Sequence, residues 1–233
     1  MAVSLRSSIA KCRSHLNAAL CNKWSFMNIL INIICALSGA VFGAWFGHKF
    51  TVKLSRDKAI KQKQALYEEI NIIHSNFLTW LKELISEFDT PLRESYSGPP
   101  SIYTQLIESL IVELSETDEI VSSEQRKLFI GLKSKNKALI DKDKKRDKFV
   151  NRWLLESETL DQADKYKTKQ GIEFWTAHLL LEVIDIVFHT SQFVEENDNF
   201  MFRDYSIEQK IMIVCQYSCI GYDESFWSRV RRR

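Results

Sequence analysis

The sequence predicts an all-α protein in which a single N-terminal transmembrane helix precedes a soluble bundle of about five or six helices. Three observations lead to this fold class. One uncharged segment is long enough to cross a bilayer. The 233 residues include only 7 Gly and 3 Pro, too few for the many tight turns of a sandwich or barrel. Apolar residues recur every three or four positions, and no segment sustains a period of two.

Residues 1–23 form a basic segment with one apolar face. Leu5, Ile9 and Leu16 fall on one side of a helix, whereas Arg6 and Lys11 fall off that stripe. A basic amphipathic helix of this kind can lie in the plane of the lipid headgroups. The alternative is a leader segment without a role of its own.

The transmembrane helix is expected at residues 24–47. The 24 residues from Trp24 to Gly47 carry no formal charge. As a helix they reach about 36 Å, enough for a hydrocarbon core of roughly 30 Å. Trp24 and Trp45 lie near the two ends, where indole side chains favour the membrane interface. A cleaved signal peptide is the alternative, and the length of the apolar segment argues against it.

Small and amide side chains recur along one face of this segment. Glycines spaced four residues apart let two helix backbones approach closely, and an amide in hydrocarbon requires a hydrogen-bond partner. We therefore expect the chain to form a homo-oligomer in the membrane through Asn28, Asn32, Ala36, Gly39, Gly43 and Gly47. The alternative is that small residues are simply common in membrane spans.

Basic residues follow the span in a juxtamembrane helix, residues 48–65, and recur in a basic tail, residues 226–233. They predict contact with anionic lipid or another anion at Lys49, Lys53, Arg56, Lys58, Arg229, Arg231, Arg232 and Arg233. Nucleic acid is an alternative partner without a supporting motif, and a disordered, solvated tail is the simplest reading. The positive charge after the span exceeds that before it, which favours a cytoplasmic C-terminal domain. The 5 cysteines lack a disulfide framework, which agrees with that side.

The soluble domain is expected at residues 66–225. Its first helix carries a stripe at spacings of three and four, which indicates either a coiled-coil stalk or the first core helix of a bundle. The stripe consists of Leu66, Ile70, Ile73, Phe77, Leu81, Leu84 and Phe88. Its aromatic residues favour the bundle. The clearest break in the chain lies in 94–101, because Gly98, Pro99 and Pro100 cannot continue a helix.

Further helices are expected after this break, at 101–120, 123–140, near 149–166, 172–196 and 207–220. Ser122 with Gln125 and Ser206 with Gln209 have the spacing of capping boxes. The basic residues 141–152 follow the second of these segments and lead into the third. In the 101–120 helix, the residues expected to face inward are Leu106, Ile107, Leu110, Ile111 and Leu114.

Only one cluster of residues resembles a chemical site. His178, Glu182, Asp185 and His189 share one face of a helix, and such side chains can bind a metal ion. The opposite face is apolar, so the simpler interpretation is that these four residues face water. The chain has no glycine-rich phosphate loop, no nucleophile elbow and no zinc-protease motif. The sequence therefore predicts no cofactor and no particular enzyme activity.

These features predict a membrane-anchored helical scaffold, sensor or regulator that works by oligomerisation and by binding a protein partner. A first alternative is a membrane-perturbing effector of a bacterial defence or toxin system, in which the spans form a leaky oligomer. That comparison rests on architecture alone. A second alternative is a metal-dependent enzyme that uses the His178, Glu182, Asp185 and His189 face.

Overall fold

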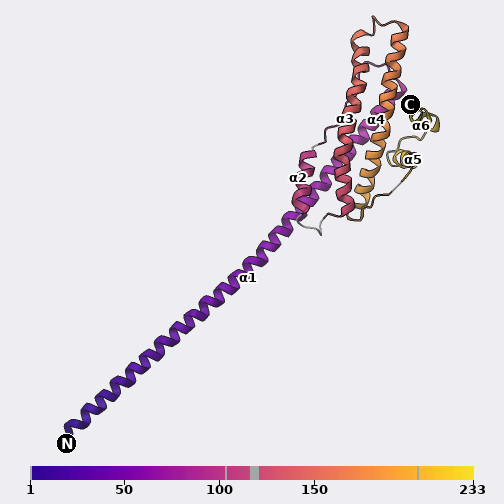
Figure 1. Ribbon diagram of the computed structural model, residues 1–233. Helices are drawn as coiled ribbons and strands as arrows, with labels where there is room; N and C mark the ends of the chain where they lie inside the picture. The colour runs from indigo at the N-terminus through magenta and orange to yellow at the C-terminus, as the bar shows by residue number, and fades with distance from the viewer. Residues whose placement is uncertain (1, 103, 116–120, 204) are drawn as a thin grey trace. The chain divides into compact units, whose positions relative to one another are not determined.

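The computed structural model describes residues 2–102, 104–115, 121–203 and 205–233, without the side chains of residues 2–26, 29, 104 and 115. Over these residues the chain is all-α and contains no strand (Figure 1). It divides into two units, residues 1–58 and 59–233. The elements are α1 (Ala2–Asp89), α2 (Thr104–Ser115), α3 (Ser123–Glu156), α4 (Gln162–Glu196), the 3₁₀ turn η1 (Asn197–Asn199), α5 (Ile207–Tyr217) and α6 (Glu224–Arg231).

The C-terminal part of α1 is the first core helix of the second unit. The predicted stripe is confirmed, because all seven of its residues, from Leu66 to Phe88, are buried. They pack inside this chain's own bundle, as the aromatic content of the stripe suggests. Phe88 packs edge-on against Phe226 of α6, and His74 hydrogen-bonds Thr190 of α4 through its Nδ1. The residues of α1 beyond Ala59 are therefore a structural part of the domain.

Helices α3 and α4 form a long hairpin whose members lie side by side (Figure 1). The capping box at Ser122 and Gln125 is confirmed, and Asp161 caps α4 by accepting a hydrogen bond from the backbone N–H of Asp164. The expected break at the basic segment is wrong, since α3 continues through residues 141–152 to Glu156. That segment contains neither Gly nor Pro, and its charged side chains are compatible with a helix that has water on one face.

Helix α4 is enclosed by its neighbours. From Thr176 to Phe193 its buried residues lie on nearly every side, because α1, α3, α5 and α6 all pack against it. The expectation that the face bearing His189 points to water is therefore wrong, since only 7% of His189 is exposed. A helix that is covered all round forms the central element of a bundle.

The remaining helices complete the bundle. In α2, Ile107, Leu110 and Leu114 are buried as predicted, whereas Leu106 points outward and Ile111 is half-buried. Helix α5 begins with the predicted capping box at Ser206 and Gln209. The C-terminal residues are not a free tail, because 224–231 form α6 and bury Phe226, Trp227 and Val230 against the core.

Candidate functional site

The apolar part of α1 has the properties of a membrane-spanning helix. From Leu30 onward it is long and apolar enough to cross a bilayer, and none of its most hydrophobic stretch is buried. Large apolar side chains such as Leu37, Val41 and Phe42 are more than half exposed. Lys49 Nζ lies 4.2 Å from the centre of the Trp45 ring, a cation–π pair suited to the membrane interface. Exposed apolar side chains therefore cover the described surface of this stretch.

The glycine stripe on this helix is uncovered. A methyl group added at Gly39, Gly43 or Gly47 would meet no other described part of the chain within 4 Å. Asn28, Asn32 and Ala36, which extend the stripe, are exposed as well. The Ser38 hydroxyl is satisfied within the helix, by donating to the Ile34 carbonyl at 2.7 Å. The six predicted residues thus form one open face with room for a second backbone.

The basic residues predicted to contact anions fall into two groups. Lys49, Lys53, Arg56 and Lys58 are exposed on α1 just after the apolar stretch. The C-terminal arginines instead make contacts within the fold. Arg229 pairs with Asp89 at 2.7 Å, Arg231 pairs with Glu208 and Glu224, and Arg233 pairs with Glu173. Arg232 donates from Nε to the Ser228 carbonyl at 3.1 Å.

These ion pairs change what the C-terminal arginines can do. Arg229 also lies over the rings of Phe88 and Phe226, so it contributes to packing as well as to charge. Pairing with Glu208 and Glu224 raises the pKa of Arg231 above its ordinary value. Arg229, Arg231 and Arg233 are therefore engaged by carboxylates of the fold, which reduces the charge that they offer to an external anion.

Lysines occupy the face of α4 that carries the candidate metal ligands. Lys135 from α3 and Lys210 from α5 both pair with Asp185, and Lys142 pairs with Glu182. Hydrogen bonds from His189 and the two lysines hold the pKa of Asp185 well below its usual range, against the opposing effect of burial. Within the described residues, no group of three His, Cys, Asp or Glu side chains is arranged to hold a metal ion.

The two histidines of this face do not converge. His189 Nε2 lies 3.5 Å from Asp185, whereas the ring of His178 stacks on Phe174 with ring centres 4.3 Å apart. The His178 Nδ1 atom hydrogen-bonds the Phe174 carbonyl at 2.9 Å. The lysine ammonium groups that pair with Glu182 and Asp185 supply the positive charge that a metal ion would bring. This face is therefore a set of ion pairs that joins α3, α4 and α5.

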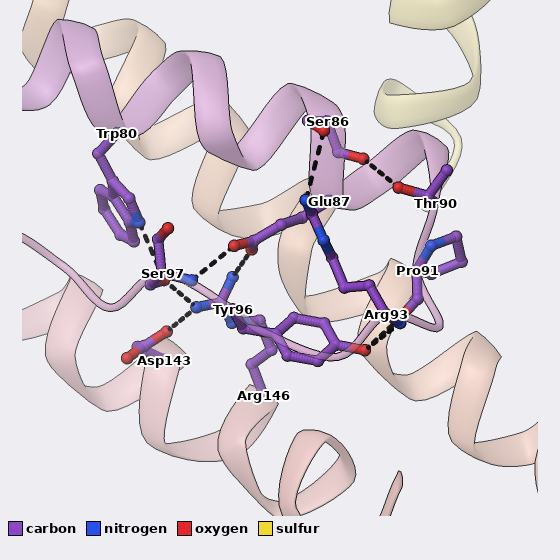
Figure 2. A network of polar contacts seen from close by, with 10 residues as sticks. All are labelled: Trp80, Ser86, Glu87, Thr90, Pro91, Arg93, Tyr96, Ser97, Asp143 and Arg146. Carbon is purple, nitrogen blue, oxygen red and sulfur yellow. Dashed lines mark hydrogen bonds and ion pairs between the residues drawn. The ribbon is translucent and has the colours of Figure 1, made fainter. Parts of the chain in front are cut away.

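A buried polar network that the sequence analysis did not identify lies between α1 and α3 (Figure 2). Arg146, 1% exposed, contacts Glu87 through Nη1 at 2.5 Å and Asp143 through Nη2 at 2.7 Å. The same Nη2 donates to the Ser97 carbonyl at 2.6 Å, and the Ser97 amide donates to Glu87 at 2.6 Å. Trp80 Nε1 also donates to the Ser97 carbonyl, at 3.1 Å.

This network fixes the connecting segment 91–101, which has no regular secondary structure. Tyr96 closes a local turn by donating to the Pro91 carbonyl at 2.6 Å, and Trp153 Nε1 donates to the Arg93 carbonyl at 3.1 Å. Side chains of α1 and α3 thus supply hydrogen bonds that a helix or sheet would otherwise supply. Figure 2 shows Ser97 between Trp80, Glu87 and Arg146.

The charge in the network is unbalanced, since one guanidinium faces two buried carboxylates. Burial raises the pKa of Asp143 to about 6, and Arg146 opposes that rise. Burial likewise raises the pKa of Glu87, against the opposing charges of Arg146 and Arg93. The sequence did contain a signal for this site. Leu139, Asp143, Arg146 and Val150 follow steps of four, three and four, which places two charged residues on the buried stripe of α3.

The comparisons with known proteins identify no relative. No family model matches the sequence, and no match was found among the curated proteins or the solved structures. The functional conclusion therefore rests on the geometry and chemistry of the chain itself.

Proposed function

We propose that this chain is a single-pass membrane protein that self-associates in the bilayer and presents its helical domain as a binding platform on the cytoplasmic side. One observation carries the proposal, namely the apolar stretch of α1 whose described side chains are all exposed. Apolar surface of this extent is stable in hydrocarbon and would drive aggregation in water.

Membrane integration is tested by fractionating cells that express the full chain. We expect the protein in the membrane pellet, resistant to alkaline carbonate and soluble in detergent. A double change, Leu37→Arg and Val41→Arg, places two charges in the middle of the span, each costing about 2.5–3.5 kcal/mol on insertion scales. It should release the protein from the membrane. A carbonate-soluble wild type would refute the anchor.

The glycine stripe supports self-association, because nothing in the described chain covers it. Gly43→Ile adds bulk where two backbones would approach, so a membrane two-hybrid signal should fall severalfold. Val41→Phe is the matched control, since it adds the same number of carbon atoms on the opposite face of the helix. Equal signals from the two variants would refute this interface.

The cysteines allow a test of orientation. Cys219 is exposed and Cys215 is buried in the domain, so Cys219 is the reactive thiol once Cys12, Cys21 and Cys35 are changed to serine. A membrane-impermeant maleimide should label Cys219 only after the cells are permeabilised. Labelling of intact cells would place the domain outside and would reverse the proposed orientation.

The end of the α3–α4 hairpin supports the platform role. It exposes Leu154, Leu155 and Tyr166, and Leu155 is 84% exposed. Exposed apolar side chains of this size are typical of surfaces that bind another protein. Leu155→Asp should abolish the capture of a partner by crosslinking in cells, whereas the nearby change Glu158→Gln should leave that capture intact. A partner retained by both variants would exclude this surface.

Permeabilisation of the membrane is a second candidate function, favoured by the amides at Asn28 and Asn32 on the open face. An oligomer with polar atoms along its interface can admit water. A membrane-potential dye distinguishes the two functions after induced expression. Loss of potential with wild type but not with Gly43→Ile would favour a leaky oligomer, and an intact potential would favour the platform.

A further inference from the structure

A hollow of about 280 Å³ lies between α2 and α3. Its floor is formed by buried side chains that include Ile107, Phe129 and Leu132. Its mouth is flanked by Val112 and Ile130, which are 64% and 66% exposed. The hollow thus opens from the domain core onto an apolar patch at the surface.

The chemistry of the lining excludes most classes of ligand. Among the described residues that line the hollow, only Glu108 and Lys133 are polar, and they pair with each other at 2.7 Å. A ligand with hydrogen-bonding groups along its length would leave them without partners here. An apolar hollow is also a poor site for water, because water needs polar partners. The lining therefore favours a hydrocarbon ligand.

The size of the hollow limits the length of that hydrocarbon. Its volume corresponds to roughly nine water molecules at liquid density, and a methylene group occupies a similar volume. A saturated chain of about eight to ten carbon atoms fits this volume.

The rim of the hollow favours a negatively charged head group. Lys133 is 60% exposed and its partner Glu108 is 44% exposed, so their ion pair contributes little and exchanges easily. A carboxylate at the end of the bound alkyl chain can replace Glu108 as the ion-pair partner of Lys133, while the Glu108 side chain moves into solvent. An alkyl carboxylate thus satisfies both the apolar floor and the cation at the mouth.

We propose that the hollow between α2 and α3 binds a medium-chain fatty acid, with its alkyl chain against Ile107, Phe129 and Leu132 and its carboxylate at Lys133. The site lies wholly within the second unit. None of the described residues that line it belongs to residues 24–47, on which the proposed anchoring and self-association rest.

Photoaffinity labelling of the full chain in lipid nanodiscs tests the site. The probe is decanoic acid with a photoreactive diazirine near the end of its chain, and mass spectrometry maps the adducts. We expect adducts on peptides that contain residues 102–112 and 129–133, and we expect unlabelled decanoate to suppress them while butyrate does not. Adducts found only in residues 24–47 would show partition into the bilayer and would overturn the proposal.

Two variants of α3 separate occupancy of the hollow from general changes in the domain. Ile130→Trp blocks the mouth at an exposed position and should lower labelling at the hollow by about tenfold. Ile140→Trp makes the same change at another exposed position outside the hollow, and it should leave labelling unchanged. Circular dichroism confirms that both variants are folded. Equal labelling of the two folded variants would refute the site.

The head-group contact has its own test. Lys133→Gln removes the cation while keeping the mouth open, so labelling by the decanoate probe should fall by about threefold. Labelling by the corresponding photoreactive decanol, which has no charge, should be unaffected. If Lys133→Gln changes neither probe or weakens both equally, the carboxylate does not bind at Lys133 and the proposed ligand class is wrong.

Discussion

Replacing Arg146 by methionine tests whether the buried network holds the connecting segment 91–101 in place. Methionine has a similar length and a good helix propensity, so α3 itself should persist. The change removes the ion pairs to Glu87 and Asp143 and the hydrogen bond to the Ser97 carbonyl. It leaves two buried carboxylates without a cation between them.

The expected loss follows from the burial of this pair. The Arg146 and Glu87 side chains are each 1% exposed, and removing one partner of such a pair costs about 3–5 kcal/mol. Both carboxyls already have raised pKa values, so in the variant they should take up protons more readily still. Arg146→Met should therefore lose the whole ~3–5 kcal/mol of unfolding free energy at pH 7.5 and clearly less at pH 5, where the carboxyls can be neutral.

Urea unfolding of the full chain in detergent, followed by tryptophan fluorescence, measures this loss. Trp80 donates to Ser97 and is one of the chain's 6 tryptophans, so part of the emission comes from the network. Arg152→Met is the matched control, because Arg152 lies on the same helix, is 38% exposed and pairs with Asp164 at the surface. That change should cost less than about 1 kcal/mol. Equal losses for the two variants, or a loss that does not depend on pH, would refute the reasoning.

Three other changes probe the same domain. Burial raises the pKa of Asp143 to about 6 in the folded chain. Its contribution to the stability of the fold is therefore fully present below its ordinary pKa and is lost as the pH rises through 6. In urea titrations, the free energy of unfolding of wild type should rise by up to about 3 kcal/mol between pH 7.5 and pH 4 relative to that of Asp143→Asn. The same pH dependence for both proteins would contradict this. A methyl group at Gly171 would lie 2.4 Å from the Phe149 ring, so Gly171→Ala should cost about 1–3 kcal/mol in thermal unfolding unless Phe149→Leu accompanies it. Ser122→Ala removes a helix cap and should cost about 1 kcal/mol, whereas Ser123→Ala, one residue into the helix, should be near neutral.

Features set by short-range physics were predictable from the sequence. The core stripe from Leu66 to Phe88 follows from the helical period, and both capping boxes follow from side chains three residues apart. The uncharged run from Trp24 to Gly47 likewise needs only composition and length to be noticed. In each case the feature depends on residues close together in the sequence, so the pattern that predicts it contains the residues that form it.

Features that depend on distant partners were not predictable. The charged segment 141–152 looks like a break, yet its helix continues, and α4 packs along it with Glu182 paired to Lys142. The C-terminal arginines look like a free tail, yet Arg229 and Arg231 lie in α6, which the buried Trp227 anchors to the core. The His178 and His189 face looks solvated until α3 and α5 place lysines over it.

The Arg146 network also has a consequence for the rate at which the domain comes apart. Glu87 and Arg146 are separated by 59 residues in the chain, so their contact closes a long loop. We expect such a contact to form after the transition state of folding, when the α3–α4 hairpin is already in place. Changes at Arg146 should then speed unfolding and leave the folding rate almost untouched. The connecting segment would thus slow unfolding, so it would affect the lifetime of the native domain more than the rate at which the domain folds.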